Sequence, residues 1–225
     1  MKTIGAACLI LWAGVFSAAL AQELTTAQVL AKLDEKAKVF TSLEATLSNS
    51  QVTADDKAPA QTGKLYIKTE KGGTTPRLLW DITEPKNAET YLIDKSGIVI
   101  FNRSKKTVSR KPIGTNSDML QLLVMGFGVP SSTLTKNYKA EAKPRQAVNG
   151  VQTVPLELQS ITPATAKFAK ITLYLDPQTW TPVRTRIIEK GALAGDYNDF
   201  NYSNIKLNKG VSDSVFNLKL PNNSK

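Results

Sequence analysis

The 225-residue chain contains no histidine and only one cysteine, Cys8. Without histidine, a Ser-His-Asp triad, a Cys-His pair and an ordinary zinc site are all excluded. The chain also lacks a glycine-rich phosphate loop, because Gly72-Gly73 has neither the required spacing nor a following helix. Enzymatic chemistry would then rest on carboxylates such as Asp81, Glu84 or Asp196, and these are more simply read as strand-edge and loop charges. We therefore expect a protein that is not an enzyme and that needs no cofactor or metal.

The first 21 residues have the pattern of a cleaved signal peptide. Lys2 supplies positive charge, an apolar run covers residues 4–16, and Ala19-Leu20-Ala21 forms a cleavage site before Gln22. The apolar run is shorter than the roughly 20 residues that cross a bilayer, so an uncleaved anchor is the less favoured alternative. We expect a periplasmic protein, residues 22–225, that forms a single domain. Cleavage would remove Cys8, so a packed core has to stabilise the fold without disulfides.

The clearest strand pattern lies between Arg77 and Pro85. Alternate apolar side chains share one face of this segment: Leu78, Trp80 and Ile82. Pro85 has no backbone N–H and suits the end of a strand. Segments 63–68, 91–94 and 97–102 are also strand-like, and hairpin turns separate several of them. The region from residue 63 to 111 therefore predicts a meander of antiparallel strands.

This succession resembles the bacterial periplasmic lipoprotein carrier family (LolA-like). In that family a G-x-L-x-[apolar]-K strand, here residues 63–68, precedes an apolar-x-Trp strand that ends in x-x-Pro, and a strand after a D-G turn follows. The ending at residues 216–221 resembles the family's last strand. The resemblance implies an α+β fold, an incomplete (half-open) antiparallel β-barrel with helices covering its concave apolar face. It also implies a carrier that shields the acyl chains of lipoproteins or a related lipid. Such a carrier passes them from an inner-membrane lipoprotein-releasing transporter to an outer-membrane acceptor.

Two segments predict helices. Residues 25–43 repeat apolar side chains at helical spacing and carry lysines on the other face, which predicts a helix packed on a sheet. Residues 117–127 are apolar almost throughout and are followed by Gly128 and Pro130. Such a helix must be covered on nearly all sides, either as a buried core helix or as a lid over an apolar hollow. The resemblance favours the lid, in which Met119 and Met125 would adapt to variable contents.

The predicted lipid-binding residues are the apolar side chains of the meander and of the lid. They are Leu65, Ile67, Leu78, Trp80, Ile82, Tyr91, Ile93, Ile98, Ile100, Met119, Leu122, Leu123 and Met125. In the resembling family an arginine directly after the lysine of the first strand binds lid carbonyls. Here that position is Thr69, and Arg77 is the nearest arginine that could close the lid instead; a solvent-exposed arginine is the plain alternative. Trp180 lies in a predicted turn and is expected to be remote from the hollow.

Later segments predict further strands, at residues 154–158, 168–175, 183–188, 200–207 and 215–220, with an Asn-Gly hairpin at 149–150. A sheet of about ten strands should curl, although a closed sandwich is an alternative. For function, the alternatives to a monomeric carrier are a lipid- or lipoprotein-sensing module of the same fold and a carboxylate hydrolase. Nothing in the chain indicates a nucleic-acid partner. The net charge of +10 favours anionic surfaces such as lipid headgroups.

Overall fold

The computed structural model describes residues 23–53, 56, 58–69, 76–86, 88–112, 123–162, 164 and 166–220. The predicted signal peptide, Met119 and Leu122 lie outside these residues. Within the described ranges, no helix has the length and apolar character needed to span a membrane. The same ranges contain no group of three or more acidic, histidine or cysteine side chains that could hold a metal ion.

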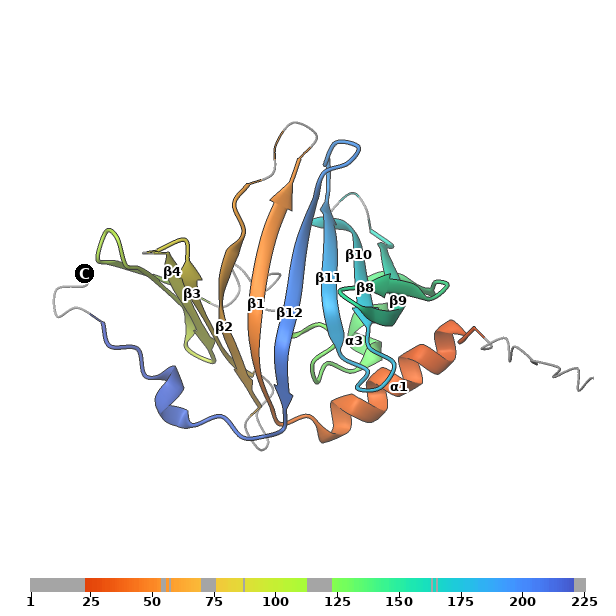
Figure 1. Ribbon diagram of the computed structural model, residues 1–225, viewed down its shortest axis with the longest axis horizontal. Coiled ribbons are helices and arrows are strands. Elements are labelled where there is room, and N and C mark those ends of the chain that lie inside the picture. The colour runs from red at the N-terminus through yellow and green to blue at the C-terminus, as the bar shows by residue number, and fades with distance from the viewer. Residues whose placement is uncertain are drawn as a thin grey trace, which may run out of the picture.

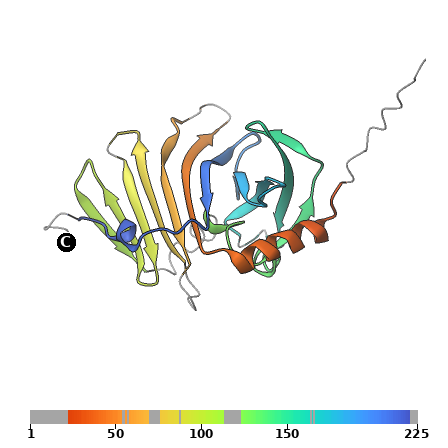
Figure 2. The same cartoon turned by 60° about the horizontal axis from the view of Figure 1, so that its bottom comes forward.

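Twelve antiparallel strands form one curved sheet in the described part of the chain (Figures 1 and 2). Their order is β6-β5-β4-β3-β2-β1-β12-β11-β10-β9-β7, with β8 paired to β9. The strands are β1 (Ser42–Val52), β2 (Gln61–Lys68), β3 (Arg77–Glu84), β4 (Glu89–Asp94), β5 (Gly97–Asn102), β6 (Thr107–Lys111), β7 (Tyr138–Ala142), β8 (Gln146–Val148), β9 (Val151–Ser160), β10 (Phe168–Leu175), β11 (Pro182–Glu189) and β12 (Tyr197–Leu207). The two ends of this order, β6 and β7, do not pair with each other among the described residues, so the sheet is not closed. The meander predicted for residues 63–111 is confirmed as β2 to β6.

Helix α1 (Thr26–Val39) begins where the sequence predicts and ends earlier. Thr25 and Gln28 form a capping box at its start, with Gln28 Oε1 accepting from the Thr25 backbone N–H at 2.8 Å. The chain is extended from Phe40 onward and enters β1 at Ser42, so the predicted end at residue 43 is wrong. The buried side chains of α1, Val29 and Leu33, join the main core. Whether helices cover the concave face stays a prediction.

A second short helix, α3 (Ser131–Thr135), was not predicted from the sequence. Its first residue is held by α1: the Asp34 carboxylate accepts from the Ser131 backbone N–H at 2.7 Å and from its hydroxyl at 2.8 Å. The predicted helix at 117–127 is described only from Leu123 onward. There Leu123 and Val124 are helical and a turn follows.

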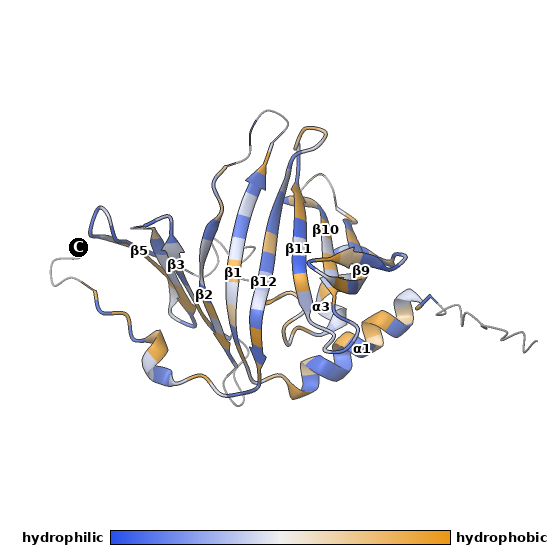
Figure 3. Ribbon diagram, in the orientation of Figure 1, coloured by the Kyte–Doolittle hydropathy of each residue, from blue (hydrophilic) through white to orange (hydrophobic). Residues whose placement is uncertain are grey.

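Side chains on one face of the sheet, here called the inner face, form one buried cluster that extends from β5 to β9. Along β1, for example, Leu43, Ala45 and Leu47 are buried, while the alternating positions between them are partly exposed. Figure 3 shows this mixture of apolar and polar positions along the strands. Two smaller apolar clusters are separate from this core, one at β3 around Leu79 and one at β8, β10 and β11 around Val148, Tyr174 and Val183.

The C-terminal segment lies against the outer face of β3. Leu79 packs there with Val211 and Phe216, in a cluster separate from the main core. Strand β3 therefore makes apolar contacts on both of its faces. The predicted strand at 215–220 is wrong, because Ser212 caps a 3-10 helix, η2 (Asp213–Phe216), at this place. Phe216, together with Val215 and Leu218, packs against Leu79 on the outer face instead.

Candidate functional site

The inner face brings together every predicted lipid-binding residue that the structure describes. Buried in the main cluster are Leu65, Ile67, Leu78, Trp80, Ile82, Ile93, Ile98, Leu123 and Met125. Tyr91 and Ile100 are partly buried and pack against the same cluster. Met119 and Leu122 lie outside the described residues. The strands thus gather these side chains on one face, whereas their role in lipid binding stays a prediction.

Trp80 is the centre of an aromatic row on this face. Its ring stacks on Tyr91 at 5.8 Å between centroids and lies 6.5 Å from Phe200 at a tilt of 59°. Phe127 and Tyr202 form an edge-to-face pair at 5.1 Å. Sequence reasoning missed Phe200, Tyr202 and Phe127. The period-2 spacing of Phe200 and Tyr202 was visible, but not which strands would share their face.

At the end of this row formed by β4 and β5, the Tyr91 hydroxyl donates to Oε2 of Glu89. Asn102 Nδ2 donates to Oε1 of the same carboxylate at 3.2 Å. Burial raises the pKa of Tyr91, and the bond to the Glu89 carboxylate raises it further. Tyr91 therefore remains a neutral phenol at any physiological pH. The apolar face thus ends at β4 and β5 in a fixed group of polar side chains.

Residues 123–128, here called the covering segment, pack onto the inner face. Leu123, Val124, Met125 and Phe127 are all buried in the main cluster. Gly126 and Gly128 have φ values of +83° and +76°, in the left-handed region that other residues rarely adopt. A Cβ at Gly126 would lie 2.8 Å from Pro182 Cγ, and one at Gly128 would lie 2.4 Å from Phe40 Cδ1. The glycines therefore let the segment turn sharply while it lies close to β11 and to the end of α1.

A cavity of about 250 Å³ lies beside the covering segment. Its walls come from the end of α1, the covering segment, the β10–β11 turn and the end of β12, and they include Phe40, Gly126, Gly128, Thr179, Thr181 and Leu207. The lining combines apolar groups with hydroxyls.

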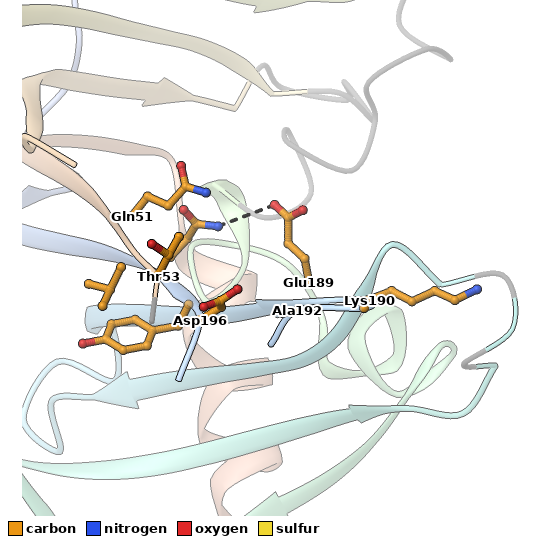
Figure 4. Close-up of a pocket in the computed structure, with 10 residues that line it drawn as sticks. Gln51, Thr53, Glu189, Lys190, Ala192 and Asp196 are labelled. Carbon is orange, nitrogen blue, oxygen red and sulfur yellow. Dashed lines mark hydrogen bonds between the residues drawn. The ribbon is translucent and has the colours of Figure 1, made fainter. Parts of the chain in front are cut away.

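Two other hollows lie away from the covering segment. One of about 580 Å³ lies on the outer face, where Arg186 holds Asp199 through two bonds of 2.8 Å. The other, of about 230 Å³, lies at the rim and is shown in Figure 4 with Gln51, Glu189 and Asp196 among its lining residues. The carboxylates considered for a hydrolase are not gathered in one site. Asp81 of β3 pairs with Arg103, whereas Asp196 lies at the rim.

The structure gives Arg77 partners that the lid-closing hypothesis did not foresee. It shares with Leu79 the face of β3 opposite to Leu78 and Trp80, which is the outer face. There it donates to Asp213, and its guanidinium lies 4.8 Å from the centre of the Phe216 ring. Hydrogen bonds from Lys68 and Arg77 lower the pKa of Asp213. These contacts attach the C-terminal segment, not the covering segment.

Replacing Arg77 with leucine should therefore loosen the C-terminal segment and leave ligand binding unchanged. Loss of the ion pair and of the contact with the Phe216 ring should lower hydrogen-exchange protection at residues 211–217. Amide exchange followed by mass spectrometry measures this directly. A change in lipid release without a change in exchange would return Arg77 to the lid-closing role.

Comparison with known proteins gives structural matches only. No protein-family model matches the chain, and no curated protein sequence matches it. It resembles MucB at 13% identity over 86% of this chain and 62% of that chain, with a TM-score of 0.55. MucB from Pseudomonas aeruginosa is also matched in its complex with MucA, with a TM-score of 0.51. An uncharacterized conserved protein from Thermus thermophilus is matched at 11% identity over 88% and 96% of the two chains, with a TM-score of 0.53.

A LolA superfamily protein from Nitrosomonas europaea is also among the matches, at 15% identity over 87% and 98% of the two chains and a TM-score of 0.40. The solved structures that this chain resembles thus include a protein of the superfamily that the sequence also resembles. The chain spans about three-fifths of the MucB chains that it matches. At these identities the likeness concerns the arrangement of the chain, not its ligands.

Proposed function

We propose that this protein binds the acyl chains of a lipoprotein or related lipid on the inner face of the sheet and carries them across the periplasm. It is a binding protein, not an enzyme. An inner-membrane releasing transporter would supply the cargo and an outer-membrane acceptor would receive it. The observation that carries the proposal is a continuous apolar inner face on a sheet that is not closed, with a short glycine-containing segment packed onto it.

Binding and release are both feasible because cargo and covering segment compete for the same surface. Burying one acyl CH₂ is worth roughly 0.8 kcal/mol, so a long chain contributes on the order of 10 kcal/mol. The cargo must displace side chains of the covering segment, and each buried one is worth about 1.5–3 kcal/mol. Four such side chains, Leu123, Val124, Met125 and Phe127, offset most of the gain. The net affinity then permits transfer to an acceptor.

Trp80 should report this binding. Adding a diacylated lipopeptide should shift its emission, because the ring, 2% exposed, would exchange protein neighbours for acyl chain. From its place in a turn, Trp180 was expected to lie away from the hollow and to emit constantly. Its side chain is instead only 9% exposed and belongs to the same cluster, so its emission can also change. The titration therefore uses Trp180→Phe protein, with Trp80→Phe as the control. An unchanged emission maximum in Trp180→Phe at saturating lipopeptide would argue against cargo on the inner face.

The likeness to MucB, described in complex with MucA, favours a second candidate, a lipid-sensing module that binds a protein partner. The two functions differ in the fate of the lipid after it has bound. A carrier gives up its lipid to acceptor vesicles, whereas a sensor retains it and changes its affinity for a partner. Transfer of a fluorescent lipopeptide from the protein to vesicles distinguishes them.

A further inference from the structure

Three polar atoms on the inner face have no hydrogen-bond partner within the described part of the chain. They are Oδ1 of Asn49, Nε1 of Trp80 and Oγ1 of Thr185. Asn49 follows Leu43, Ala45 and Leu47 on the inward positions of β1, and Thr185 precedes the core residue Ile187 by two on β11. Thr185 is 0% exposed. Buried polar groups are nearly always paired, so three unpaired ones on one apolar face call for a ligand.

All three atoms belong to residues that surround Phe200. Asn49 is the cross-strand partner of Phe200 on one side, and Thr185 is its partner on the other. Neighbouring strands lie about 4.8 Å apart, so Asn49 and Thr185 flank Phe200 across roughly 10 Å. The Trp80 ring approaches the same phenylalanine at 6.5 Å between centroids. Polar groups from three strands thus lie around the same phenylalanine.

The Thr185 hydroxyl has one polar neighbour. Burial raises the pKa of Tyr202, and the nearby Thr185 hydroxyl offsets part of that rise. Oγ1 of Thr185 has no hydrogen-bond partner among the described residues and so keeps its capacity for one. Tyr202 also contacts Phe127 of the covering segment at 5.1 Å, so displacement of that segment would expose this group of residues to cargo.

We propose that Asn49, Trp80 and Thr185 recognise the polar linkage of the cargo, and that a chain joined through a secondary amide is preferred to the same chain joined through an ester. The inference rests on the proposed function, because this site lies on the face that would hold the acyl chain. An indole N–H can only donate, and the Asn49 oxygen can only accept. A secondary amide offers one carbonyl and one N–H to these groups. An ester offers acceptors alone and leaves Asn49 unpaired.

The test compares two probes that differ by one group, N-propyldodecanamide and propyl dodecanoate. Isothermal titration calorimetry of the full mature protein should show about tenfold tighter binding of the amide, since a buried acceptor left unpaired is costly. Asn49→Leu should lower the amide affinity to that of the ester and leave the ester affinity unchanged. The matched control is Gln51→Leu, two residues further along the same face of β1 and exposed, which should keep the preference.

A second measurement uses the unmodified protein and does not depend on any variant folding. The indole N–H resonance of Trp80 should move downfield with either carbonyl probe and stay in place with dodecane. Equal affinities for amide and ester, a preference that survives Asn49→Leu, or a static indole resonance would each overturn the proposal. Failure of dodecane and both probes to bind at all would overturn the proposed function with it.

Discussion

Oxidation of a variant that carries Phe40→Cys and Gly128→Cys should abolish uptake of acyl ligands, and reduction should restore it. A Cβ at position 128 would lie 3.1 Å from the Cβ of Phe40, slightly closer than the 3.5–4.5 Å of a disulfide. Removal of the Phe40 ring also removes the contact that excludes a side chain at position 128. The bond would tie the covering segment to the end of α1, and Leu123 to Phe127 would stay on the inner face.

No native cysteine should compete for the engineered disulfide, because the only one in the chain, Cys8, lies in the predicted signal peptide. Uptake is measured with a fluorescent lipopeptide before and after reduction. Each single-cysteine variant should bind equally under both conditions, which controls for the substitutions themselves. Binding by the fully oxidised double variant would mean that cargo enters without displacement of the covering segment.

A second large effect is expected from Gly128→Ala. The new methyl group would meet the Phe40 ring at 2.4 Å, and the residue would have to hold a φ of +76°. The left-handed conformation costs about 1–2 kcal/mol for an L-residue, and overpacking about 1–3 kcal/mol more. Because this cost falls on the covered form alone, the variant should melt at a lower temperature, bind lipid more tightly and release it more slowly.

Gly150→Ala is the matched control for this prediction. Gly150 has a φ of +80° in the β8–β9 hairpin, and a Cβ there would have no neighbour within 4 Å. The Gly150→Ala variant should lose the stability that the left-handed backbone conformation costs, and its lipid affinity should stay unchanged. Calorimetric melting and vesicle transfer assays are performed on both variants. Equal effects of the two substitutions on transfer would show that the contact between Gly128 and Phe40 plays no part in release.

Local patterns predicted the parts of the fold that local forces determine. Period-2 spacing predicted β2 to β5, the Asn149-Gly150 pair predicted the β8–β9 hairpin, and Thr25 predicted the start of α1. Helix α3 escaped prediction because its sequence favours helix weakly and its first turn is held by Asp34, 97 residues earlier in the chain.

The site was predictable only where one strand defines it. Leu78, Trp80 and Ile82 share a face by backbone geometry, so their common burial could be predicted. Their neighbours Phe200 and Asn49 depend on the pairing of β1 with β12, which joins segments about 150 residues apart. For Arg77, its nearness to Thr69 in the sequence suggested the lid-closing role, which stays a prediction, and the partner Asp213 that the fold places beside it could not be foreseen from the sequence.

The central claim is that the inner face holds acyl chains in the periplasm. Its most direct test is native mass spectrometry of protein isolated from the periplasm under mild conditions, followed by identification of released lipid. The account predicts one acylated species for each protein molecule, and its absence from the Phe40→Cys/Gly128→Cys variant, which would oxidise before loading. Protein that is free of acylated species, or an equal load on the locked variant, would contradict it.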